Sequence, residues 1–131
     1  MQVLNPLGLN LLAQPVAALR DEDGRPRFEV LLRMSDSDGE SISSGSLFSA
    51  AERYNLMPQI DRWVINATLV AISGGEIKLP THRSCAINLS GQTLCDAEIM
   101  DYIRDRIEHH GIDASHLCFE ITETAVIATA M

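Results

Sequence analysis

The chain has 131 residues, a length that suits one domain or part of a larger one. With 46% hydrophobic and 21% charged residues, it has the composition of a folded globular protein rather than a disordered one. A formal net charge of −8 argues against DNA or RNA as the main partner, because a phosphate backbone requires a basic surface.

The location of the chain is indicated by its cysteines and its apolar runs. Cys85, Cys95 and Cys118 are odd in number and form no C-x-x-C pair, which favours buried free thiols in a reducing compartment. No apolar stretch is long enough to cross a bilayer, so we expect no membrane segment in this chain. Residues 1–10 lack the pattern of a signal peptide and are expected to be leader or linker. The sequence therefore predicts a cytoplasmic protein.

The first part of the chain predicts a hairpin of two strands. An apolar run from Leu9 to Leu19 contains Gln14-Pro15, and proline restricts such a strand to an edge or a strand end. A charged turn with glycine and proline follows at residues 21–26, and residues 27–34 predict the next strand. A link this short favours antiparallel pairing.

The middle of the chain predicts a loop and then two helices. Residues 35–46 are rich in Ser, Asp and Gly and lack periodicity, which indicates a surface loop. Apolar residues recur at helical spacing over residues 47–54 and 57–72. Gly74-Gly75 is expected to end the second helix.

The remaining chain alternates strands and helices. Strands are predicted over residues 84–89 and 117–121, and an amphipathic helix over residues 96–110, with Asp96 as its cap and Gly111 in the left-handed position after it. A further helix is expected to start at Thr122. Strands alternating with helices predict parallel pairing through right-handed crossovers. The predicted fold class is therefore α/β.

Two of the predicted strands contain a carboxylate. Glu29 and Glu120 each lie in an apolar run, where a carboxylate is costly unless it is paired or holds a metal. Asn88 ends the strand between them, and oxygen donors at the ends of successive strands are typical of cation sites in βα barrels. Simpler interpretations remain open, because Glu29 could pair with Arg33 on the same strand face and Asn88 could be a turn residue.

Several motifs in order resemble the N-terminal half of an EAL domain, the cyclic di-GMP phosphodiesterase family of bacterial signalling proteins. The resemblance rests on Gln14-Pro15, Glu29-Val30-Leu31-Leu32-Arg33, Ala51-Glu52-Arg53-Tyr54, Ile60-Asp61-Arg62-Trp63-Val64-Ile65, Asn88-Leu89-Ser90 and Glu120-Ile121-Thr122-Glu123-Thr124. It implies a partial TIM-type (β/α) barrel with an antiparallel first strand, truncated after about half the barrel. It also implies hydrolysis of cyclic di-GMP to linear pGpG.

The resemblance implies roles for individual side chains. It implies three ligands for Mg²⁺ or Mn²⁺, namely Glu29, Asn88 and Glu120. It implies that Gln14 contacts the substrate, that Arg33 contacts a substrate phosphate, and that Glu123 supports the loop near the metal and the dimer contact.

This sequence departs from the family pattern in two ways. The signature Glu-Ala-Leu has valine at position 30, and we expect its two extra methyl groups to lie beside the site without abolishing function. The family's later motifs, an aspartate pair and a catalytic lysine among them, are not among these residues. We therefore expect residues 1–131 to be the N-terminal part of a single EAL domain, inactive alone, which self-associates or belongs to a larger chain.

Two other functions remain open at this point. The chain could be a non-catalytic EAL-like module that binds a nucleotide or a protein partner in signalling. It could instead belong to a different metal-dependent barrel enzyme, an interpretation that accounts for Glu29, Asn88 and Glu120 but not for the other motifs.

Overall fold

The computed structural model describes residues 9–16, 27–36, 38–77 and 84–121. In chain order, these residues form β1 (Leu9–Val16), β2 (Arg27–Ser35), β3 (Ser41–Ile42), α1 (Ser44–Arg53), α2 (Met57–Ser73), β4 (Ser84–Leu89), α3 (Gly91–Leu94), α4 (Ile99–His110), the 3-10 helix η1 (Ala114–His116) and β5 (Leu117–Ile121). None of the helices in this part of the chain combines the length and apolar character that crossing a membrane requires.

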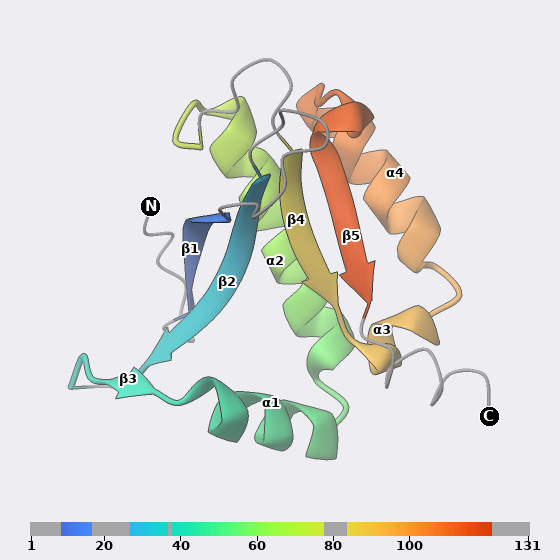
Figure 1. Ribbon diagram of the computed structural model, residues 1–131. Helices are drawn as coiled ribbons and strands as arrows, with labels where there is room; N and C mark the ends of the chain where they lie inside the picture. Colours follow the sequence, from blue (N-terminus) through green and yellow to red (C-terminus); the bar gives the residue numbers. More distant parts are fainter. Residues whose placement is uncertain (1–8, 17–26, 37, 78–83, 122–131) are drawn as a thin grey trace.

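The strands form one mixed sheet in the order β1-β2-β4-β5, with β3 paired to the end of β2 (Figure 1). β1 runs antiparallel to β2, whereas β4 is parallel to both β2 and β5. The helical segment between β2 and β4 and the one between β4 and β5 are the connections that parallel pairing requires. The predicted α/β class and the antiparallel first strand are confirmed, and the sheet is consistent with part of a barrel.

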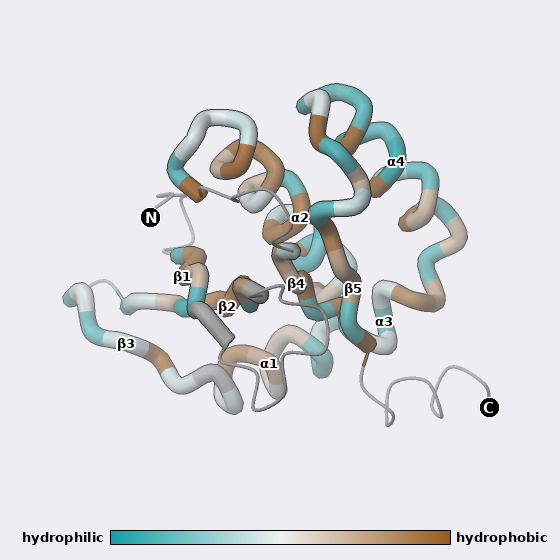
Figure 2. The backbone as a smooth tube through the Cα atoms, turned by 45° about the horizontal axis from the view of Figure 1, so that its top comes forward, coloured by the Kyte–Doolittle hydropathy of each residue, from teal (hydrophilic) through white to brown (hydrophobic). Residues whose placement is uncertain are grey.

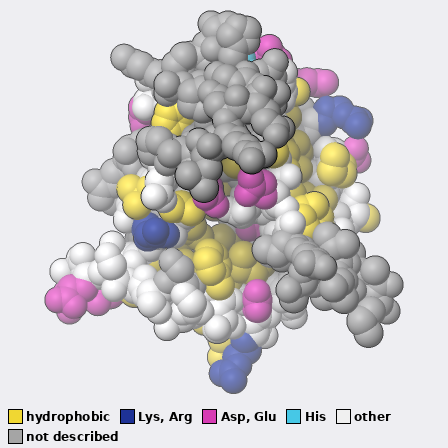
Figure 3. Space-filling model, in the orientation of Figure 1, with side chains coloured by type: hydrophobic (Ala, Val, Ile, Leu, Met, Phe, Trp, Pro, Cys, Tyr) yellow, Lys and Arg dark blue, Asp and Glu magenta, His cyan; other side chains and the backbone are white. Residues whose placement is uncertain are grey.

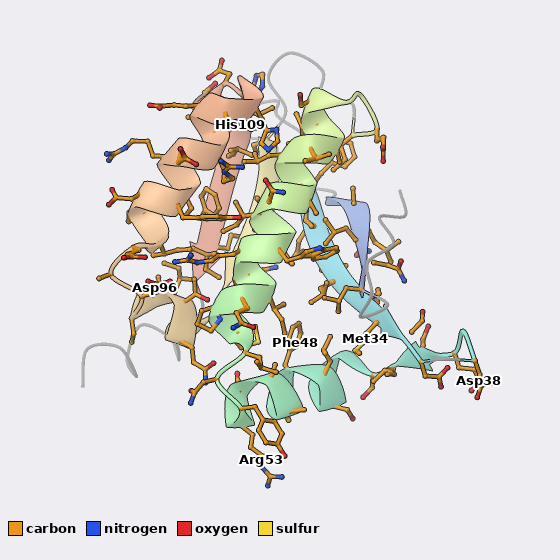
Figure 4. The ribbon with its side chains drawn as sticks, turned by 180° about the vertical axis from the view of Figure 1, so that it is seen from behind. Met34, Asp38, Phe48, Arg53, Asp96 and His109 are labelled. Atoms are coloured by element: carbon orange, nitrogen blue, oxygen red, sulfur yellow. The ribbon has the colours of Figure 1, made fainter. Side chains whose placement is uncertain are left out.

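The helices α2 and α4 cover one face of the sheet, and no helix of the described residues covers the other face (Figures 1 and 4). Hydrophobic residues line the strands and much of α2, whereas α4 carries many hydrophilic residues (Figure 2). The core lies between the sheet and the helices, and its members include Leu11, Val30, Leu32, Ile65, Leu69, Ile87 and Ile103. We call the opposite side of the sheet the helix-free face.

Helix α4 begins later than predicted. It starts at Ile99 with Glu98 as its N-cap, and no side chain caps it; the Asp96 carboxylate lies before the helix, where it accepts the Glu98 backbone N–H at 3.0 Å and forms a 2.7 Å ion pair with Arg62 of α2. The prediction that the helix starts at Asp96 and is capped by it is therefore wrong. Its predicted end is confirmed, because Gly111 follows the helix in the left-handed conformation, with φ of 65°.

The predicted loop over residues 35–46 is partly wrong. It contains β3 and the start of α1, which Ser43 caps by accepting the Ser46 backbone N–H at 3.2 Å. The predicted strand residues 17–19, the turn at residues 21–26 and the helix from Thr122 lie outside the described residues.

The three cysteines are free thiols, as predicted, but they differ in burial. Cys85 is fully buried, and burial raises the pKa of its thiol to about 11, so it stays neutral in the core. Cys118 is half-buried and Cys95 is exposed, so the prediction of three buried thiols is wrong for Cys95.

Candidate metal centre

The predicted site residues meet on the helix-free face because of strand register. Gln14 is in register with Glu29 across β1 and β2, and Asn88 is in register with Glu120 across β4 and β5. Glu29 is also in register with Ala86, two positions before Asn88. Since alternate residues of a strand share a face, Gln14, Glu29, Asn88 and Glu120 all lie on the same side of the sheet.

Glu29 and Asn88 are in direct contact. The Asn88 amide Nδ2 donates a hydrogen bond of 3.1 Å to Oε1 of Glu29, which joins β4 to β2. The Asn88 amide also carries a carbonyl oxygen, so an oxygen donor is available beside the Glu29 carboxylate. Glu29 is half-buried, whereas Asn88 and the neighbouring Glu120 are exposed. The structure therefore brings together the three side chains that the sequence predicted to converge.

These side chains fit the chemistry of a hard divalent cation, but they form an incomplete ligand set. Two carboxylates and one amide offer oxygen donors, the type that Mg²⁺ and Mn²⁺ prefer. Within the described ranges, no group of three or more His, Cys, Asp or Glu side chains is placed to hold a metal ion. Glu29, Asn88 and Glu120 can thus supply part of a coordination sphere, which other donors would have to complete.

The two predicted substrate contacts lie on the same face as the three oxygen donors. Arg33 follows Glu29 by four positions on β2, so strand alternation places both side chains on the helix-free face. Its Nη1 donates a hydrogen bond of 3.0 Å to the Leu32 carbonyl oxygen. Gln14 is exposed at its position opposite Glu29. Glu123, the predicted loop residue, lies outside the described residues.

The helix-free face combines apolar and acidic side chains. Figure 3 views the molecule from this side and shows acidic side chains among hydrophobic ones near the centre of the view. Leu12 of β1, on the same face by register with Leu31, is 45% exposed. The carboxylates therefore lie beside apolar surface.

Valine 30 does not lie beside the site. The Val30 side chain is only 4% exposed and belongs to the core between the sheet and the helices, on the face opposite Glu29. The prediction that its methyl groups lie beside the site is therefore wrong. The departure from Glu-Ala-Leu at this position changes the core, not the surface that carries the oxygen donors.

One residue near the site was missed by the sequence interpretation. Asp61 of α2 is a carboxylate with only 4% exposure, and its Oδ2 accepts hydrogen bonds from the Ser90 backbone N–H and from the Thr93 hydroxyl. A signal was available, because Asp61 lies four residues after Met57 and four before Ile65, on the buried stripe of α2. A carboxylate on such a stripe requires a partner.

The family model of the EAL domain matches residues 7–131 of this chain. That match spans nearly the whole sequence. The chain belongs to the EAL domain family.

Named relatives include two curated cyclic di-GMP phosphodiesterases. The chain is 37% identical over 114 residues to PdeF of Escherichia coli K12, an alignment that covers 87% of this chain. It is 35% identical over 126 residues to PdeB of Shewanella oneidensis MR-1, covering 96% of this chain. In each case the chain spans only 15% of the length of the relative.

Solved structures with a similar fold are also EAL domains or phosphodiesterases. The FimX EAL domain from Pseudomonas aeruginosa bound to c-di-GMP has a TM-score of 0.81 and 25% identity, covering 94% of this chain and 48% of that one. The c-di-GMP complex of the PaMucR phosphodiesterase has a TM-score of 0.73 and 28% identity, covering 91% and 48%. The chain thus corresponds to about half of these solved domains.

Proposed function

We propose that this chain contributes the N-terminal part of a metal-dependent site that hydrolyses cyclic di-GMP to pGpG. The observation that carries the proposal is the contact between Asn88 and Glu29, with Glu120 in register beside Asn88 on the helix-free face. Two relatives named as cyclic di-GMP phosphodiesterases support the choice of substrate, as do two similar structures that contain c-di-GMP, one of an EAL domain and one of a phosphodiesterase.

In this proposal, Glu29, Asn88 and Glu120 hold Mg²⁺ or Mn²⁺ through their side-chain oxygens. When bound, such a cation withdraws charge from a phosphate and acidifies a water molecule, the chemistry that phosphodiester hydrolysis requires. The carboxylates of Glu29 and Glu120 bring negative charge to the site, which favours a divalent cation over a neutral ligand. The chain's own contribution is to hold these oxygens on adjacent strands, β2, β4 and β5, whose register fixes their spacing.

The proposed substrate contacts follow from charge and position. Arg33 carries a guanidinium group on the same face as Glu29, and a guanidinium can bind a phosphate through two parallel hydrogen bonds. Gln14 lies opposite Glu29 and offers both a donor and an acceptor for a nucleotide. Glu123 is proposed to support the loop near the cation.

We also propose a cytoplasmic location for the protein, because its described cysteines are free thiols, as is usual in a reducing compartment.

The test replaces Asn88 in the complete protein and follows both cation binding and turnover. Asn88→Ala removes the amide beside Glu29, so we expect Mn²⁺ affinity to fall at least roughly tenfold, since even residues outside the ligand shell carry effects of this size. We also expect the formation of pGpG, measured by chromatography, to fall with it. Asn66→Ala is the matched control, because Asn66 lies on α2 and contacts His110 at 3.1 Å, away from the site.

The outcomes of this experiment separate the candidate functions. Loss of Mn²⁺ affinity and of turnover in Asn88→Ala, with neither changed in Asn66→Ala, supports the proposal. Cyclic di-GMP binding without any pGpG from the unmodified complete protein would instead identify a nucleotide-binding module. An Asn88→Ala protein with unchanged Mn²⁺ affinity would exclude the proposed cation site.

A further inference from the structure

We propose that Asp61 is a positioning residue that fixes the turn after Asn88 and thereby sets the cation affinity of the site. The inference rests on the proposed function, because it assumes that Asn88 is a cation ligand. It assigns a role to a buried carboxylate that neither touches the proposed site nor faces it.

Asp61 holds residues 90–93, which lead from β4 into and through most of α3 and which we call the turn after Asn88, through two hydrogen bonds. Its Oδ2 accepts the Ser90 backbone N–H at 2.9 Å and the Thr93 hydroxyl at 2.5 Å. Both partners that the described residues provide for it lie in this turn, and neither lies on α2 itself. The Asp61 carboxylate therefore connects the first turns of α2 to the residues that follow β4.

The turn is closed by a second set of hydrogen bonds. Ser90 caps α3, since its hydroxyl accepts the Thr93 backbone N–H at 3.2 Å and lies 2.9 Å from the Thr93 hydroxyl. Thr93 is fully buried. Removal of the Asp61 carboxylate would therefore take away the acceptor that the Thr93 hydroxyl and the Ser90 backbone N–H share. Loss of a charged acceptor from a buried network of this kind alters the preferred geometry of its donors.

The turn is directly connected to the proposed ligand. Asn88 lies on the helix-free face, Leu89 packs into the core, and Ser90 is the residue that Asp61 binds. Only Leu89 thus separates the anchored Ser90 amide from Asn88, whose side chain is held at 3.1 Å from Glu29. A shift of the Ser90 amide is expected to move Asn88 relative to Glu29, and cation ligands tolerate small displacements poorly.

The test is a double-mutant cycle on cation affinity in the complete protein. Asp61→Asn keeps the size of the side chain and one acceptor oxygen but removes the charge. We expect Mn²⁺ affinity, measured by calorimetric titration, to fall roughly tenfold, the lower end of the effect seen for groups that orient ligands. In an Asn88→Ala background, the same Asp61→Asn change should have no further effect on Mn²⁺ affinity, because the ligand it positions is gone.

Asp96→Asn is the matched control. Asp96 is also an aspartate tied to α2, through its ion pair with Arg62, but the other partner of its carboxylate is the Glu98 backbone N–H, which precedes α4, and neither partner lies in the turn after Asn88. We expect its replacement to leave Mn²⁺ affinity unchanged. A metal-independent measurement accompanies the cycle: hydrogen exchange of the Ser90 amide should become faster in Asp61→Asn than in Asp96→Asn in metal-free protein.

Two results would overturn the positioning role. One is an unchanged Mn²⁺ affinity in Asp61→Asn, and the other is an equal fall in affinity with and without Asn88, which would indicate a general loss of structure. Failure of the proposed function has a different signature. In that case Asn88→Ala leaves Mn²⁺ affinity unchanged, while Ser90 amide exchange still reports whether Asp61 holds the turn.

Discussion

Glu29 and Val30 are adjacent in the chain, but their side chains lie on opposite faces of β2. Glu29 accepts a hydrogen bond from Asn88 on the helix-free face, whereas Val30 is buried in the core on the helix side. Position 30 therefore affects stability, and position 29 affects the proposed chemistry. The two effects can be separated by experiment.

Val30→Ala is expected to destabilise the protein without changing cation affinity. Removing two buried methyl groups should lower the free energy of unfolding by about 2 kcal/mol, from lost burial and an incompletely filled cavity. Urea denaturation measures this effect, and Mn²⁺ titration checks the site. Val70→Ala is the matched control, because Val70 on α2 is 44% exposed and should cost far less. An equal cost at both positions would contradict the assignment of Val30 to the core.

Arg33 is expected to contribute to substrate binding through the geometry of its guanidinium group. Arg33→Lys keeps the positive charge but loses the planar pair of donors, so the KM for cyclic di-GMP should rise roughly tenfold. Arg33→Ala should raise it further. Steady-state kinetics of the complete protein measure both. Arg53→Lys, at the exposed end of α1, is the control and should behave as the unmodified protein. Equal KM values for all these proteins would exclude a phosphate contact by Arg33.

Asp96 is expected to make stability depend on pH in the acid range. The Glu98 backbone N–H, together with the Arg62 guanidinium, holds the pKa of this carboxyl below its usual value. Because the folded-state pKa is the lower one, the contribution is complete above about pH 4 and is lost as the pH falls through the folded value. The stability difference between the unmodified protein and Asp96→Asn should therefore shrink below about pH 4. Urea denaturation between pH 7 and pH 3 tests this, and a constant difference would contradict it.

The 131-residue chain produced on its own is expected to self-associate. In the described part of the sheet, β5 pairs with β4 alone, and Leu12 and Ile121 are 45% and 42% exposed. Unpaired strand edges and exposed apolar surface both favour association. Light scattering at several concentrations measures it, and Ile121→Lys, which adds a charge at the edge strand, should weaken it. A stable monomer across the range would refute this expectation.

The sequence was most informative where a local pattern decides the structure. The strands over residues 84–89 and 117–121 were predicted to the residue, because each is an apolar run with polar boundaries. Helix α2 was predicted within one residue from its repeat of apolar positions. Asn88 and Glu120 could be assigned to strand ends for the same reason.

Elements that depend on distant partners could not be read in the same way. Helix α3 has four residues, too few for a period, and β3 exists through the pairing of Ile42 with Met34. Asp96 carries the signal of a helix cap, but its ion pair with Arg62, which lies on another element, determines its position. The contact between Glu29 and Asn88 likewise requires the register of β2 on β4, which no local pattern specifies.

The hydrogen bond from Asn88 to Glu29 spans 59 positions of the chain, whereas β1 and β2 are neighbours in sequence. Contacts between distant positions form slowly, because a long loop must be closed before they are gained. The pairing of β1 with β2, which carries Glu29, can therefore form early. The hydrogen bond from Asn88 to Glu29 can form only after the connection through α2 has brought β4 beside β2. Under the proposed function, the cation site is therefore expected to be completed late in folding.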